Sequence, residues 1–273
     1  METIINSLLQ EYRALNLHNI KDYDLFNNIA IIHHSSSIEG STLTLTDSEL
    51  LIAEGLTPKG KPLQHTLMVK DHYEALLFTL DLASNKGKEL NIRDIQEINA
   101  KVNKNTGGIV NSTLGSVDVA KGEFRKNNVR AGDTYFVNYD KVPTLTSRLV
   151  KEINENINLV KTDNEKLELS FAAHFNLVSI HPFMGGNDWT SRLLMNFLQQ
   201  KFNLPLSIVY QEDKVDYINA LKESRKDRGL NHFYDFMFQQ YKKYLTAEIG
   251  NARKLVEKAS KSNQKHRGLS FVL

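Results

Sequence analysis

The chain has 273 residues, 41% of them hydrophobic and 24% charged, with a formal net charge of +2 at pH 7. This composition is that of a globular protein with a substantial core, and the near-neutral charge gives no support to nucleic-acid binding. The lack of cysteine excludes disulfides, thiolate metal sites and a cysteine nucleophile. With no signal peptide and no 18-residue apolar run, we expect a cytoplasmic protein without a membrane partner.

The predicted elements, taken in chain order, are mainly helices. Apolar residues recur at three- and four-residue spacing through most of the chain, which is the period of an amphipathic helix. We predict helices over residues 5–12, 23–36, 65–85, 92–103, 141–159, 165–180, 190–202, 214–224 and 231–259, and a further helix that contains residues 50–52 and is capped by the segment 44–47. We expect Phe26 to face inward, and Asp71 and His72 to lie on a solvated helix face.

Residues 107–143 interrupt the helical pattern with glycines and polar side chains. Two short extended runs, 129–130 and 134–137, flank Ala131-Gly132-Asp133, whose residues are typical of a hairpin turn. There is no internal repeat and no linker long enough to separate domains. We therefore predict a mainly α fold, a single all-helical domain with one small β-hairpin, followed by a polar tail over residues 260–273.

The segment 180–192 combines the residues best suited to chemistry. His181 lies between two predicted helices, Gly185 and Gly186 follow it, and Arg192 lies in the second helix. Glycine-rich backbone that leads into a helix presents free N–H groups to an anion, and the helix dipole favours negative charge. An imidazole titrates near neutral pH and can accept a proton. The segment therefore predicts a phosphate site with its own base.

The same segment resembles the signature of Fic domain proteins, which is His-Pro-Phe, any residue, Asp or Glu, Gly-Asn-Gly-Arg, two variable residues and Arg. The matching positions are His181, Pro182, Phe183, Gly186, Asn187 and Arg192. Residues 35–40 resemble the family's inhibitory pattern, which is Ser or Thr, three residues, Glu, then Gly or Asn. Residues 122–125 and the hairpin after them resemble its flap. The resemblance covers about residues 30–240.

The resemblance implies a division of the chain and a reaction. Residues 1–60 would form a helical segment with the inhibitory motif, 61–240 a Fic-like core with a flap at about 122–140, and 241–273 a C-terminal helix and tail. Active members of the family transfer AMP from ATP with Mg²⁺ to a hydroxyl group of a target protein. His181 would be the general base. The residues that would bind the nucleotide and its phosphates are Gly185, Gly186, Asn187, Arg192 and Tyr217.

The resemblance also implies an inhibitor and a docking surface. Ser35, Glu39 and Gly40 would belong to an inhibitory helix, and Glu39 would pair with Arg192, in competition with the terminal phosphate of the nucleotide. An extended segment of a target protein would add to the flap by main-chain hydrogen bonds. The flap residues are Val129, Thr134, Tyr135 and Phe136. Some relatives dimerise, so a homodimer is compatible with the resemblance.

Three positions depart from the signature. Gly185 replaces the acid that would bind Mg²⁺, Asp188 replaces the second glycine, and Trp189 replaces the first arginine. Glycine has no oxygen ligand for a hard cation, and tryptophan cannot replace a guanidinium. Asp188 is a candidate metal ligand from a shifted position. Three hypotheses thus stay open: an autoinhibited AMP-transferase, a non-catalytic nucleotide- or protein-binding regulator, and a transferase of another phosphate-containing group.

Overall fold

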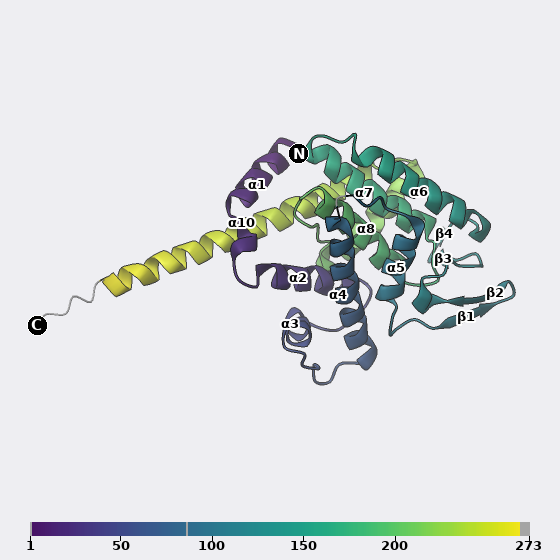
Figure 1. The fold of residues 1–273 in the computed structure, drawn as a ribbon, viewed down its shortest axis with the longest axis horizontal. Coiled ribbons are helices and arrows are strands. Elements are labelled where there is room, and N and C mark those ends of the chain that lie inside the picture. Colours follow the sequence, from purple (N-terminus) through teal and green to yellow (C-terminus); the bar gives the residue numbers. More distant parts are fainter. Residues whose placement is uncertain (1, 86, 268–273) are drawn as a thin grey trace, which may run out of the picture.

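The computed structural model describes residues 2–85 and 87–267, with side chains described up to residue 254. Its elements pack into one helical body from which the C-terminal helix extends (Figure 1). The α-helices are α1 (Glu2–Ala14), α2 (Tyr23–Ile38), α3 (Leu45–Ala53), α4 (Leu63–Ser84), α5 (Ile92–Val102), α6 (Val142–Ile157), α7 (Asp163–Ile180), α8 (Asn187–Lys201), α9 (Lys214–Asp227) and α10 (Asn231–Arg267). The prediction of a mainly α fold is confirmed.

Helix α8 lies at the centre of the body and packs against α4, α5 and α7. Nearly all of its residues are buried, and the run Leu193 to Leu198 has apolar side chains around most of the helix. A helix that is hydrophobic on all sides belongs in a core. Because α7 ends at Ile180 and α8 begins at Asn187, the loop between them is held at both ends by core helices.

Two antiparallel hairpins lie side by side at the edge of the body opposite the C-terminus (Figure 1). The predicted one is confirmed, although its strands β3 (Arg130–Ala131) and β4 (Thr134–Tyr135) are short. The other, β1 (Ile109–Ser112) with β2 (Gly115–Asp118), was not predicted. One of its eight residues, Val117, is buried, so this hairpin lacks the regular alternation of apolar and polar positions that marks a half-buried strand.

The prediction for Phe26 is wrong, because its side chain is 48% exposed. Phe26 lies in the first turn of α2, where it lines a groove with Ile20, Leu45 and Tyr244. The body covers α2 on a broad face further along the helix, from Asn28 onward. The first turn is therefore left at the rim of the core.

The prediction for Asp71 and His72 is also wrong, because both are buried. Helix α4 packs against α2, α5 and α8, so its polar side chains also face protein. Asp71 accepts hydrogen bonds from the backbone N–H of Asn105, at 2.7 Å, and from the Asn105 side chain. Internal partners of this kind make burial of a carboxylate tolerable.

The C-terminal helix continues further than predicted. Helix α10 runs beyond residue 259 to Arg267, and the lysine, glutamine and arginine residues in this stretch are good helix formers despite their polarity. The last part of the predicted tail, residues 268–273, lies outside the described residues. In the described part of the chain, no helix combines the length and hydropathy needed to cross a membrane.

Candidate active site

The loop between α7 and α8 begins with a residue in a strained backbone conformation, which hydrogen bonds hold in place. His181 ends α7 in the left-handed region, with φ 53° and ψ 60°, and its N–H donates to the Leu177 carbonyl at 3.0 Å. Such a conformation costs a non-glycine residue about 1–2 kcal/mol. The Asn187 side chain then closes the loop: its Oδ1 accepts from the Phe183 N–H and its Nδ2 donates to the Phe183 carbonyl, both at 2.9 Å. The side-chain amide of Asn187 therefore shapes the loop, and its predicted contact with phosphate stays a prediction.

Asn99 of α5 and Asn103, directly after that helix, pack around the glycine pair, and nothing in the sequence indicated their role. Asn99 Nδ2 donates to the Gly185 carbonyl at 3.0 Å. Gly186 has φ +73°, and a Cβ there would lie 2.6 Å from Asn103 Nδ2, so only glycine fits. At Gly185, by contrast, an added Cβ would make ordinary contacts, the nearest at 3.4 Å from Val119. A side chain is therefore sterically acceptable at residue 185 but not at 186.

The His181 ring is covered by the flap. Phe136 stacks on it with ring centroids 3.8 Å apart and an interplanar angle of 13°. Burial lowers the pKa of His181 to about 4, so the imidazole is neutral at pH 7 and can accept a proton. Of the flap residues predicted to bind a target, Phe136 faces His181, whereas Tyr135 is 77% exposed. Val129 accepts the N–H of Phe136 at 3.3 Å, and Thr134 pairs with Ala131 across the hairpin.

Arg125 joins the flap to the loop between α7 and α8. Its side chain is buried, and its Nε donates to the carbonyl of His181 at 2.8 Å. Its Nη1 donates to the carbonyl of Asn127 at 2.8 Å, and its Nη2 to that of Val137. The Arg125 N–H also donates to the Pro182 carbonyl at 3.0 Å. The sequence indicated Arg125 only as part of the flap segment, because nothing in a single sequence shows a side chain that binds carbonyl groups.

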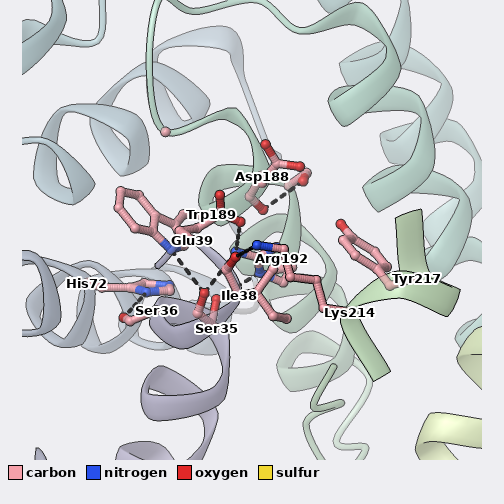
Figure 2. Close-up of polar contacts among 12 residues, drawn as sticks. Ser35, Ser36, Ile38, Glu39, His72, Asp188, Trp189, Arg192, Lys214 and Tyr217 are labelled. Carbon is pink, nitrogen blue, oxygen red and sulfur yellow. Dashed lines mark hydrogen bonds and ion pairs between the residues drawn. The ribbon is translucent and has the colours of Figure 1, made fainter. Parts of the chain in front are cut away.

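The predicted pair of Glu39 with Arg192 is present in the structure (Figure 2). Arg192 Nη2 donates to Glu39 Oε1 at 2.9 Å, and its Nε donates to Ser35 Oγ at 2.7 Å. Gly40 follows with φ +96°, which lets the chain turn away just beyond the end of α2. All three predicted inhibitory residues, Ser35, Glu39 and Gly40, therefore lie at the end of α2 that faces α8.

Burial disfavours the charge of both members of this pair, although Glu39, Tyr217 and Asp188 together leave the pKa of Arg192 raised. Burial raises the pKa of Glu39, Arg192 lowers it, and the negative charge of Asp188 raises it further. The Glu39 side chain is still 29% accessible to solvent, whereas that of Arg192 is 4% accessible. Arg192 Nη1 is buried and has no hydrogen-bond partner among the described residues. A buried guanidinium with an unused donor is suited to bind an anionic ligand.

Trp189 lies at a position where the Fic signature has an arginine, and its side chain also faces α2. Its side chain is buried, and its Nε1 donates to the Ser35 carbonyl at 3.2 Å. The indole packs against the His72 ring at a centroid distance of 5.6 Å. Figure 2 shows Trp189 and Arg192 reaching the end of α2 from the same helix.

Comparison with known proteins agrees with this geometry. Residues 89–199 match the model of the Fic/DOC family. The chain belongs to this family. Its similarity to the Protein adenylyltransferase Fic of Nematostella vectensis is 32% identity over 198 residues, which is 71% of this chain and 42% of that protein. The corresponding protein of Drosophila erecta is also 32% identical, over 70% of this chain and 36% of the relative. The chain thus spans less than half the length of these relatives.

Solved structures show the same fold. A Fic domain containing signaling protein from Bacteroides thetaiotaomicron superposes with a TM-score of 0.78 at 22% identity, covering 92% of this chain and 97% of that one. Fic-1 from C. elegans superposes with a TM-score of 0.71 at 22% identity, covering 93% of this chain and 73% of that one. At this identity the likeness concerns the fold alone.

The segment that follows His181 offers a single acid, Asp188, to a metal ion. Mg²⁺ in nucleotide sites is bound by one or two carboxylates and the phosphates of the substrate. Gly185 provides no ligand, and Asp188 is the acid that remains on this segment. Within residues 2–85 and 87–267, no three His, Asp or Glu side chains gather as a metal site. The role of Asp188 as a metal ligand stays a prediction, and no step below depends on it.

Tyr217 lies beneath the site and not in an open pocket. It is 2% exposed, and its hydroxyl shares a 2.9 Å hydrogen bond with His174 Nε2. Burial raises its pKa, so the phenol is neutral. The predicted contact of Tyr217 with a nucleotide stays a prediction, because in this structure the ring packs against Phe233 and Phe236.

Buried histidines make the stability of this protein sensitive to mild acid. Burial lowers the pKa of His34 and of His181 to about 4, and also lowers the pKa values of His33, His72 and His174. An unfolded histidine titrates near 6.5, so below that pH the unfolded state binds more protons than the folded one. We expect the free energy of unfolding to fall by about 1–3 kcal/mol between pH 7 and 5.5.

Urea unfolding measured at several pH values tests this expectation. His34→Phe, which keeps a ring beside Tyr210, should make the dependence on pH shallower. His232→Phe should not, because His232 is exposed on the surface. A free energy of unfolding that does not change down to pH 5.5 would contradict the assignment.

Proposed function

We propose that this chain transfers AMP from ATP to a hydroxyl group of a target protein, and that α2 inhibits the transfer. The observation that supports this best is the 2.9 Å ion pair of Glu39 with Arg192, on the helix that follows the His181 loop. The names of the curated relatives, protein adenylyltransferases, agree with it. We also propose that the protein acts in the cytoplasm, on a protein target, and that a homodimer forms.

The proposed reaction uses the residues of the loop in distinct roles. The hydroxyl oxygen of the target attacks the α-phosphorus of ATP, and the bond from that phosphorus to the oxygen bridging to the β-phosphate breaks. Pyrophosphate leaves with the bonding electrons. His181, neutral at pH 7, takes the hydroxyl proton. The backbone of Gly185 and Gly186 leads into α8 and would contact phosphate oxygens, and Arg192 would neutralise their charge.

Inhibition follows from competition for one guanidinium. Arg192 Nη2 is bound to Glu39, so a phosphate can use this donor only after the carboxylate has moved. Glu39 and Asp188 both add negative charge beside the place where phosphates would bind. Like charges at about 4 Å repel by about 1–4 kcal/mol, depending on the local dielectric. We therefore propose that Glu39 lowers both the affinity for ATP and the fraction of bound ATP that is aligned for attack by the hydroxyl group.

A second candidate is a nucleotide- or protein-binding regulator without transferase activity. Gly185 and Trp189 support it, because they remove a metal ligand and a phosphate clamp. A third candidate is a transferase that uses another phosphate-containing donor. A screen of donors on the Glu39→Gly protein separates this candidate from AMP transfer.

The test is labelling with ATP carrying a radioactive α-phosphate. Loss of a charge-assisted hydrogen bond such as that of Glu39 corresponds to about 1.5–3 kcal/mol. We therefore expect Glu39→Gly to increase labelling of the protein itself or of lysate proteins about tenfold or more. The matched control is Glu54→Gly, since Glu54 also lies directly after a helix but is exposed and away from Arg192. If the Glu39→Gly protein binds ATP but transfers nothing from any donor, the regulator is the correct alternative.

A further inference from the structure

We propose that Trp189 is a positioning residue that holds the inhibitory helix α2 in place. This inference deepens the proposed function and rests on it where it concerns activity. Trp189 stands at a position where the Fic signature has an arginine, and by itself the exchange removes a phosphate clamp. The structure assigns the tryptophan a different partner, the end of α2.

The first step of the argument concerns the carbonyl groups at the end of α2. The last four carbonyls of a helix lack partners within the helix and need other donors. The N–H groups of Glu39, Gly40 and Ser41 donate to the carbonyls of Ser36 and Ser37. The Ser35 carbonyl accepts instead from two side chains of α8, Trp189 Nε1 and Arg192 Nη2, each at 3.2 Å.

The second step concerns what happens when a nucleotide binds. Arg192 binds α2 through Nε and Nη2, whereas its Nη1 is unused, so a phosphate that binds the guanidinium competes with Ser35 and Glu39 for it. The indole N–H of Trp189 cannot bind the phosphate as a cation does, and it would remain on the Ser35 carbonyl. Trp189 therefore keeps the end of α2 docked under the conditions in which the ion pair is weakest.

The third step concerns His72, which supports the indole from α4. The two rings pack at 5.6 Å and both are buried. Ser36 Oγ and His72 Nδ1 share a hydrogen bond of 3.3 Å. Trp189 thus binds Ser35, His72 binds Ser36, and the two rings contact each other (Figure 2). We call Trp189 and His72 the α2 anchor.

The decisive variant is Trp189→Phe, which keeps an aromatic ring beside His72 but removes the N–H donor. Hydrogen exchange of the backbone amides over residues 32–41 is expected to be faster by about fivefold, the factor for one lost neutral hydrogen bond. AMP labelling should rise by a similar factor when Glu39 is present, and should not change in the Glu39→Gly background. A purely structural defect would change labelling both with and without Glu39. An increase in labelling that requires Glu39 therefore shows a loss of inhibition.

The control is Phe197→Leu, a change in the same helix at a buried ring that belongs to a different cluster from Trp189. It should leave the exchange of residues 32–41 unchanged. His72→Phe provides a second route, because it retains Trp189, the one tryptophan of the chain, as a fluorophore. We expect that variant to shift the Trp189 emission to longer wavelength and to make the indole more accessible to acrylamide.

The outcomes separate the anchor from the proposed function. Exchange over residues 32–41 that stays at the wild-type rate in both Trp189→Phe and His72→Phe overturns the anchor. So does labelling that rises equally with and without Glu39. If Glu39→Gly transfers no AMP while Trp189→Phe still speeds hydrogen exchange over residues 32–41, the proposed reaction is wrong and the α2 anchor is supported.

Discussion

In the Glu39→Gly protein, His181→Ala is expected to lower the rate of AMP transfer by about 10²-fold. A positioned general base contributes about 10² to 10⁴. The pKa of His181 is about 4, and a base that weak at pH 7 gains less from proton transfer than one with a pKa near 7, so we expect the lower end of that range. The measurement is the initial rate of labelling at saturating ATP, with the affinity for ATP determined separately by calorimetry.

The control for this experiment is His232→Ala in the same Glu39→Gly protein. His232 is exposed, and its Nε2 binds Asp227 at 2.9 Å, so labelling should continue at the rate of the parent. His181→Ala should also leave the affinity for ATP within about twofold, because a neutral imidazole does little to hold phosphate. Transfer that persists undiminished after the loss of His181 would show that another group takes the proton.

Arg125→Met is expected to lower the free energy of unfolding by about 3 kcal/mol or more. The change leaves the carbonyls of His181, Asn127 and Val137 without the donors that they have now. A buried polar group without a partner costs about 1–3 kcal/mol, and methionine fills a similar volume without replacing any donor. Urea unfolding followed by circular dichroism measures the loss.

The matched control is Arg130→Met, since Arg130 lies on the flap strand β3 but is exposed. A surface substitution of this kind is usually within about 0.5 kcal/mol of neutral. Arg125→Met should also reduce labelling by the Glu39→Gly protein, because the flap and the His181 loop lose their common support. If the free energy of unfolding falls by less than about 1 kcal/mol, the guanidinium is not the support that the geometry indicates.

Much of the fold could be predicted because its determinants are local. The helical period of apolar residues and the capping segment 44–47 before α3 each depend on a short stretch of sequence, and both were confirmed. The pair of Glu39 with Arg192 joins residues 153 positions apart. It was predictable only because two separate motifs resemble those of one family, and not from the chemistry of either residue alone.

The residues that were missed act through partners distant in the sequence. Asn99 and His72 lie on helices whose local pattern gave no sign of function, and His72 was expected in solvent. Arg125 was indicated only as part of the flap, without its carbonyl partners. Their roles depend on which carbonyl or ring another segment brings within reach. Trp189 shows the same limit. The sequence shows that a tryptophan replaces the first arginine of the signature, whereas the hydrogen bond of Trp189 to the Ser35 carbonyl can be seen only in the folded protein.

The backbone at Gly185 has a consequence for how this site could change in evolution. Because an added Cβ there would make only ordinary contacts, an acidic side chain could return at this position without moving the loop. An arginine in place of Trp189 would instead put a charge beneath α2, beside His72 and close to Arg192, and would remove a donor from Ser35. The two departures are therefore not equally reversible. We propose that the acid of the Fic signature can be regained by one substitution, whereas its first arginine can be regained only together with a rearrangement of α2.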